Sequence, residues 1–155
     1  MEGASENERA VVPSLRSELF DIYKVYLGTA DKISERRASA NKWFLSVQSG
    51  LGGVYGAFSK LTDSQLYGRT GLWLLPTMGI VVSIAWLSAI GSYSSLNKAK
   101  FEVLKELEAS LAFKPLTKEQ TVYKGLGRVG FGKIERFVPV AFFILYAIVL
   151  IVGVL

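Results

Sequence analysis

Three glycines in the C-terminal half of the chain match the motif of a known chemical site. Gly125, Gly127 and Gly130 have the G-x-G-x-x-G spacing that brings a dinucleotide pyrophosphate close to the backbone. That chemistry needs a preceding strand, a following helix and an acidic residue about 20 positions further on. The chain instead enters an uncharged apolar run at Phe137. We therefore reject a dinucleotide site and interpret residues 93–136 as a cytoplasmic helix followed by a glycine-rich reentry loop.

The composition excludes most enzyme mechanisms. The 155 residues include no His and no Cys, so the chain lacks the commonest general base, the commonest metal ligand and any thiolate. No pair of carboxylates is spaced for acid–base catalysis. We expect a non-enzymatic protein without catalytic residues, cofactors or metal sites. Basic residues are interleaved with acidic ones, so nucleic acid is not an expected partner.

Apolar runs predict an all-α integral membrane protein with three transmembrane helices. Residues 71–92 and 137–155 carry no charge and have about the 20-residue length of a helix that crosses a bilayer. Residues 43–59 form a shorter run between two lysines whose long side chains can reach the headgroups. Pro139 is expected in the first turn of the third span, where helices tolerate proline.

The distribution of Lys and Arg predicts the orientation in the membrane. Residues 1–42 contain seven of them, residues 93–136 contain nine, and the link over 60–70 contains two. Because cytoplasmic segments carry the excess of positive charge, the first two segments are expected in the cytoplasm. The link and the C-terminus are then expected on the outer side, and the two cytoplasmic segments form a small helical domain.

Two cytoplasmic helices are expected to build this domain. Residues 1–13 lack periodicity and are interpreted as a disordered leader, followed by an amphipathic helix over 14–42. The helical pattern of the second span continues beyond residue 93, which predicts one long helix. The apolar seam of the first helix either packs on that long helix of the same chain or pairs between subunits. The seam consists of Leu15, Leu19, Ile22, Tyr26 and Ile33.

Small and polar residues in the first span predict close helix packing. Glycine and serine at intervals of three or four residues let helix backbones approach each other. The expected packing positions, between subunits or within one chain, are Ser49, Gly52, Gly53 and Gly56. If this span surrounds a lumen, the residues expected to line it are Ser46, Gln48 and Ser49.

Charged residues near the membrane entrances suggest two further sites. One is a juxtamembrane polar network, with a solvated surface as the alternative, over Asp31, Glu35, Arg36, Arg37, Asn41, Asn97, Lys98 and Glu135. The other is a set of basic residues available to anionic lipid headgroups, namely Lys124, Arg128, Lys133 and Arg136.

Several segments resemble one family of bacterial membrane proteins. They are DIYKVY at 21–26, ADKISERR at 30–37, ANKWFLS at 40–46, the residues from Trp86 to Tyr93, LNKAKF at 96–101, LExxL at 107–111, and KIE at 133–135 leading to VP at 138–139. Their order and spacing resemble the RipA family of octameric membrane proteins. The resemblance implies a small bacterial inner-membrane protein assembled as an octamer. In that membrane, the orientation expected from the Lys and Arg distribution gives a cytoplasmic N-terminus and a periplasmic link and C-terminus. It implies no reaction and no cofactor. Ser94-Ser95 and Gln120 depart from the pattern, where relatives have a basic residue and a Trp.

Two functions are compatible with these features. The first is a homo-oligomeric ring, expected to be an octamer, that acts as a membrane scaffold or organiser. The alternative is a pore or channel formed by the ring and gated by a cytoplasmic protein partner. No charged side chain lies within the spans, so a pore would have no proton relay and would select weakly. The expected partners are other copies of the chain, anionic lipids and a cytoplasmic protein.

Overall fold

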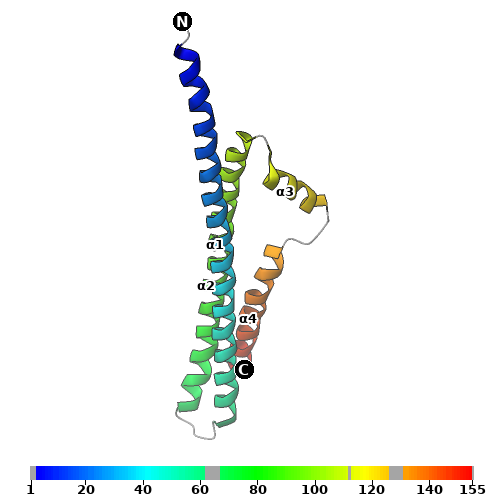
Figure 1. Ribbon diagram of the computed structural model, residues 1–155. Helices are drawn as coiled ribbons and strands as arrows, with labels where there is room; N and C mark the ends of the chain where they lie inside the picture. Colours follow the sequence, from blue (N-terminus) through cyan, green and yellow to red (C-terminus); the bar gives the residue numbers. More distant parts are fainter. Residues whose placement is uncertain (1–2, 62–66, 112, 126–130, 155) are drawn as a thin grey trace. The chain divides into compact units, whose positions relative to one another are not determined.

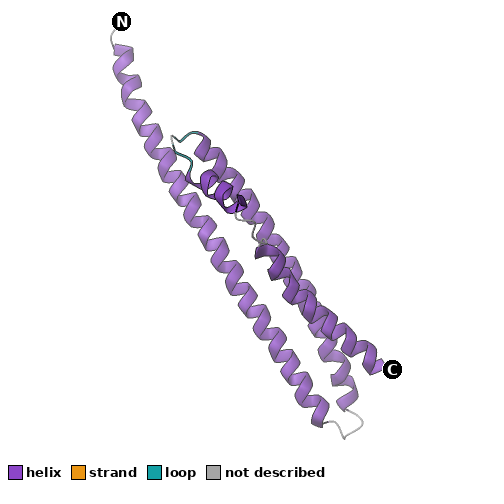
Figure 2. Ribbon diagram, turned by 90° about the vertical axis from the view of Figure 1, so that its right-hand side faces the viewer, coloured by secondary structure: helices purple, strands orange, loops and turns teal. Residues whose placement is uncertain are grey.

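The computed structural model describes residues 3–61, 67–111, 113–125 and 131–154, with side chains placed for 16–59, 73–111, 113–123, 125 and 134–152. Over these residues the fold is all-helical, as predicted, and contains no strand (Figures 1 and 2). The helices are α1 (Gly3–Leu61), α2 (Tyr67–Ala109), α3 (Pro115–Gly125) and α4 (Phe131–Val154). The chain divides into two compact units, Met1–Glu35 with Ser95–Arg128 (unit 1) and Arg36–Ser94 with Val129–Leu155 (unit 2).

Helix α1 is longer than the sequence pattern predicts. It begins at Gly3, so the expectation of a disordered leader is wrong for residues 3–13, whose backbone is helical. This stretch lacks an apolar stripe, but Ala, Glu and Arg, which have high helix propensity, make up five of its eleven residues. The helix continues without a break through the expected cytoplasmic segment (14–42) and the expected first span (43–59).

In unit 1, α1 packs on the C-terminal part of α2 (Figure 1), which favours packing within the chain for the seam of α1. The expected register of the seam is partly wrong, because Ile22 and Tyr26 are 47% and 36% exposed. The buried face contains Tyr23 and Ala30 instead, together with the predicted Ile33. The core that these helices form with α3 contains Tyr23, Ala30, Leu104 and Leu116, with Phe101, Leu107 and Leu111 packed against it.

In unit 2, α4 packs against α1 and the N-terminal part of α2. Helix α2 is continuous through Pro76 and confirms the predicted long helix. Two helical stretches, Trp73–Ala109 and Ile134–Val152, are long enough to cross a membrane and each contains an 18-residue segment that is apolar enough to do so. The mean hydropathies of these segments are 1.8 and 2.2. Among the described residues α1 does not meet this criterion, so a third transmembrane helix over 43–59 stays a prediction.

The region between α2 and α4 is more regular than expected. Residues 115–125 form the helix α3 where the sequence suggested a reentry loop. Helix α4 begins at Phe131, so Pro139 lies inside the helix and not in its first turn. Gly127 and Gly130 lie outside the described residues, as does the middle of the link expected over 60–70.

Candidate functional site

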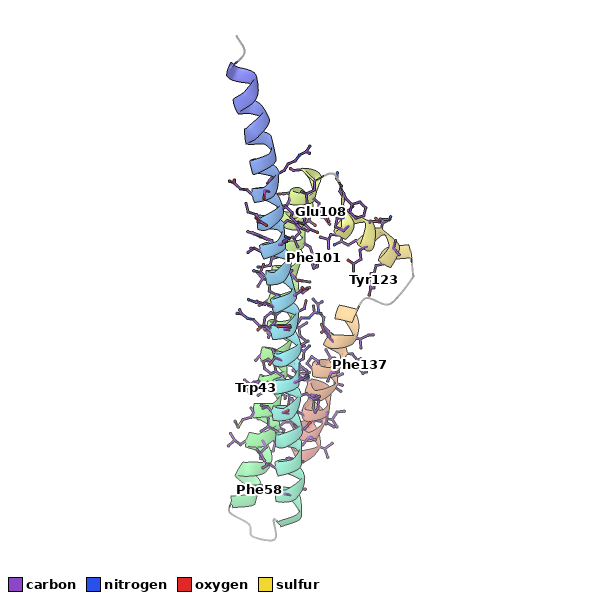
Figure 3. All side chains as sticks on the ribbon, in the orientation of Figure 1. Trp43, Phe58, Phe101, Glu108, Tyr123 and Phe137 are labelled. Atoms are coloured by element: carbon purple, nitrogen blue, oxygen red, sulfur yellow. The ribbon has the colours of Figure 1, made fainter. Side chains whose placement is uncertain are left out.

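Glu108 is the buried polar centre of unit 1, on the charged part of α2 beyond its uncharged run (Figure 3). Its side chain is 0% exposed. Oε1 accepts hydrogen bonds from the Tyr23 hydroxyl at 3.0 Å and the Leu116 amide at 2.6 Å. Oε2 accepts from the amide and the hydroxyl of Thr117, at 3.0 and 2.8 Å. One carboxylate therefore joins α1, α2 and α3.

The position of Glu108 follows from the unpaired amides at the start of α3. A helix leaves the N–H groups of its first turn without partners inside the helix. Pro115 at the first position has no N–H, and the Lys118 amide donates to the Lys114 carbonyl at 3.1 Å. The amides of Leu116 and Thr117 remain, and Glu108 accepts from both. A negative charge at this helix end is also favoured by the helix dipole.

The surroundings of Glu108 and Tyr23 determine whether each side chain is protonated. Burial opposes ionisation of Glu108, but the hydrogen bonds from Thr117, Leu116 and Tyr23 outweigh it and lower the pKa of the carboxyl group. The pKa of Tyr23 is raised to about 12. Burial is the largest cause, and the hydrogen bond to Glu108 and the negative charge of Glu108 add to it. Glu108 is therefore a charged acceptor and Tyr23 a neutral donor at neutral pH. A fully hydrogen-bonded carboxylate of this kind anchors structure and is not free to act as a base.

Gln48 is the buried polar centre of unit 2. Its side chain is 0% exposed, and Nε2 donates to the Gly79 carbonyl at 3.1 Å and to Ser83 Oγ at 2.7 Å. Ser83 Oγ donates in turn to the Gly79 carbonyl at 2.8 Å. The Tyr146 hydroxyl donates to the backbone carbonyl of Gln48 at 3.0 Å. These bonds join α1, α2 and α4, and interhelical hydrogen bonds of this type stabilise helix association in membranes.

Close packing accompanies these hydrogen bonds. A Cβ atom added at Gly79 would lie 2.7 Å from Tyr146 Cζ and closer still to Cε2, so the ring occupies the space that glycine leaves open. Phe44, Trp86, Phe142 and Tyr146 form a series of neighbouring rings, with centroid separations of 5.7, 6.5 and 6.3 Å. Rings at these separations attract each other. Aromatic contacts therefore link the same three helices.

A second polar cluster in unit 2 contains Glu135. Its Oε1 lies 3.4 Å from Arg37 Nε and accepts a hydrogen bond from Asn41 Nδ2 at 3.2 Å. Trp86 Nε1 donates to Asn41 Oδ1 at 2.8 Å, which fixes the orientation of the amide. The structure thus brings together Arg37, Asn41 and Glu135 from the expected juxtamembrane network.

The other members of that network are not drawn into this cluster. The exposed ones are Asp31, Glu35, Arg36 and Lys98. Asn97 is half-buried, and its Oδ1 has no hydrogen-bond partner among the described residues. Of the expected headgroup-binding residues, Arg136 is exposed. Arg128 and the side chains of Lys124 and Lys133 lie outside the described part of the chain.

The expectation that Gln48 lines a lumen is wrong, because Gln48 is enclosed within its own subunit. Gln48 lies one helical turn from Gly52 and therefore on the same face, whereas Ser49 lies about 100° away around the helix. Ser46 and Ser49 are exposed.

The small residues of α1 face in two directions. A Cβ atom at Gly52 would lie 3.8 Å from the Tyr146 hydroxyl, so Gly52 belongs to packing within the subunit. Cβ atoms at Gly53 and Gly56 would meet nothing within 4 Å. Ser49, Gly53 and Gly56 share a face by their spacing, and this face is open in the single chain.

The sequence did not identify Glu108 or Tyr146 as site residues, and it identified Trp86 only within the family resemblance. Tyr146 was recognisable as a polar ring within an apolar run. Glu108 has no comparable signal, because it stands among other charged residues of an amphipathic helix.

Comparison with known proteins gives one match. The family model of the octameric membrane protein family (8xMP) matches residues 20–155. No curated protein matches the chain, and no solved structure does. The match covers unit 2, unit 1 from Phe20 onward and all the clusters described above, and it confirms the resemblance to an octameric membrane protein family. The chain therefore belongs to the octameric membrane protein family, whose name implies that copies of the chain assemble with one another.

Proposed function

We propose that the protein is a non-enzymatic scaffold of the bacterial inner membrane, built as an octameric ring with a cytoplasmic N-terminus and a periplasmic C-terminus. The observation that supports a scaffold over a pore is the burial of Gln48 inside the subunit. The most polar side chain of the expected first span is used to join three helices of one chain and is not available to a lumen.

The subunit leaves two different surfaces on α1 of unit 2 for contacts outside the chain. Trp43 and Val54 are large exposed residues that share one face by their spacing, which suits lipid acyl chains. Ser49, Gly53 and Gly56 form the small-residue face defined above. Because close helix contacts in membranes use small residues, we assign this second face to the neighbouring subunit.

The number of subunits in lipid nanodiscs tests this assignment. Native mass spectrometry of the wild-type protein is expected to show octamers. Gly53→Leu adds a bulky side chain to the small-residue face at a position where its Cβ atom meets nothing within 4 Å in the subunit, so smaller assemblies are expected. Val54→Leu is the matched control on the lipid-facing side and is expected to leave the octamer intact. Monomeric wild-type protein would contradict the proposal, and octameric Gly53→Leu would contradict the assigned interface.

A pore gated by a cytoplasmic partner is the second candidate. It is favoured by Ser46 and Ser49, which are exposed and lie near Gly53 on α1. A ring that turned this face toward its axis would have a lumen lined by hydroxyl groups. Single-channel recordings in planar bilayers separate the two functions, since a pore predicts conductance that Ser49→Leu blocks without changing the subunit number.

A further inference from the structure

A cavity opens in unit 2 beside the Glu135 cluster. It has a volume of about 260 Å³, and its apolar walls come from α1, α2 and α4. The residues used below are Lys42, Leu45, Trp86, Ile134, Glu135 and Val138. Lys42 and Glu135 both lie just before uncharged runs that are expected to cross the membrane, residues 43–59 and 137–155. The cavity is therefore expected at the depth where headgroups meet acyl chains.

Glu135 lines this cavity and carries one oxygen without a partner. The Glu135 side chain is only 9% exposed, and its Oε1 already interacts with Arg37 and Asn41. Its Oε2 is buried and has no hydrogen-bond partner among the described residues. A buried carboxylate oxygen without a donor is costly, and such groups are nearly always satisfied. Asn41 cannot move to supply the donor without losing its bond from Trp86.

The other residues that line the cavity indicate which further groups a ligand needs. Lys42 is exposed, which leaves its ammonium group available to an anion at the mouth of the cavity. Leu45, Ile134 and Val138 offer apolar side chains along the cavity. A suitable ligand therefore combines a group that donates to a carboxylate, an anionic group and an apolar chain.

We propose that this cavity binds one phospholipid with a primary ammonium headgroup, of the phosphatidylethanolamine type. The Glu135 carboxyl group turns Oε2 toward the cavity, and the ammonium donates a hydrogen bond to it. The phosphate pairs with Lys42, and the first part of an acyl chain lies along Leu45 and Val138. A choline headgroup has no N–H and cannot supply this bond. A lipid with only a phosphate has no cation for the carboxylate. The proposal holds for a scaffold and for a pore alike.

Trp86 provides a direct reporter, because its indole lines the cavity. The chain contains three Trp residues, and Trp43 and Trp73 are both exposed, so replacing these two by Phe leaves Trp86 as the sole fluorophore. The full-length protein is reconstituted in vesicles of unlabelled phosphatidylcholine. Phosphatidylethanolamine, phosphatidylcholine or phosphatidylglycerol with brominated acyl chains is then titrated, and quenching of Trp86 gives their relative affinities.

A charge-assisted hydrogen bond predicts a preference of about tenfold for the ethanolamine lipid over the choline lipid. Glu135→Gln retains an oxygen for Arg37 and Asn41 but removes the charge, so this preference is expected to disappear. Glu106→Gln makes the same chemical change at an exposed position and is expected to retain it.

Four results would overturn the proposal. The first is equal quenching by the ethanolamine and choline lipids in the protein with native Glu135. The second is stronger quenching by the glycerol lipid, which would mean that Lys42 alone selects the ligand. The third is an absence of quenching, which would mean that no lipid occupies the cavity; crosslinks from the cavity to a neighbouring subunit would then show that a protein side chain supplies the donor. The fourth is a preference that survives Glu135→Gln, which would exclude the assigned contact.

Discussion

Substitution of Glu108 by Gln tests whether one carboxylate holds α3 on unit 1. The two side chains have nearly the same shape, but an amide has one acceptor oxygen and one donor group in place of two acceptor oxygens. The Tyr23 and Thr117 hydroxyls can rotate to accept from the new NH2 group. The backbone amides of Leu116 and Thr117 cannot rotate, and they bond to different carboxylate oxygens. In either orientation of the new side-chain amide, the backbone N–H of Leu116 or that of Thr117 therefore faces the NH2 group, which is a donor and not an acceptor.

The loss of stability in Glu108→Gln follows from the one backbone N–H that is left without an acceptor. An unsatisfied buried donor costs about 1–3 kcal/mol. Loss of the negative charge at the start of α3 adds about 0.3–1 kcal/mol, and the easier burial of a neutral side chain offsets part of the total. We expect Glu108→Gln to destabilise the start of α3 by about 2 kcal/mol, taking the centre of these ranges.

Hydrogen exchange of the full-length protein in nanodiscs measures this change where it occurs. Because each 1.4 kcal/mol is a factor of ten, a loss of about 2 kcal/mol accelerates exchange in peptides covering residues 115–125 by about 30-fold. Glu106→Gln is the control, since Glu106 is exposed on the same helix. Unchanged exchange at Leu116 and Thr117 in the Glu108→Gln protein would refute the reasoning. It would mean that the apolar packing of Leu116 holds α3 without the carboxylate.

Two further predictions follow from the same structure. Gly79→Ala forces a methyl group against the ring of Tyr146, which cannot move away without losing its hydrogen bond, so we expect a loss of about 1–3 kcal/mol in thermal or denaturant unfolding. Gly50→Ala, where the new methyl group meets nothing within 4 Å, is expected not to destabilise the protein. Because the folded-state pKa of Glu108 is lowered, its contribution is complete above the pKa of an unfolded Glu and is lost as the pH falls through the folded value. Unfolding of unit 1, followed between pH 7 and about pH 3, should show this loss in the wild type and not in Glu108→Gln.

The helices themselves were predictable because their signals are local. The uncharged run and the apolar repeat that follows it identify α2 as one long helix. The start of α1 was missed because the prediction relied on an apolar stripe, whereas residues 3–13 depend on intrinsic propensity. The beginning of α4 was placed too late because charged residues such as Glu135 were assigned to a loop, although the structure uses Glu135 inside the helix.

The polar sites were less predictable because they depend on which way a side chain faces around its helix and on where the chain turns back. Gln48 was grouped with Ser46 and Ser49 as a polar neighbour, but helical geometry places it on the face of Asn41, Phe44 and Gly52, where it meets α2 and α4. Glu108 acquires its role only when the chain turns back after α2 and brings two unpaired amides to its carboxylate. Nothing in the residues around Glu108 specifies that turn.

Hydroxyl groups on the expected spans do not require a water-filled lumen. Ser46 Oγ donates to the Lys42 carbonyl at 3.0 Å, Thr77 Oγ1 to the Trp73 carbonyl at 2.8 Å, and Ser88 Oγ to the Ile84 carbonyl at 2.9 Å. Each of these side chains is exposed on its subunit, yet its donor is already satisfied by the helix that carries it. Such residues can face a neighbouring helix or lipid at little cost. Ser46 is therefore compatible with a close contact to a neighbouring helix, which agrees with the proposed scaffold.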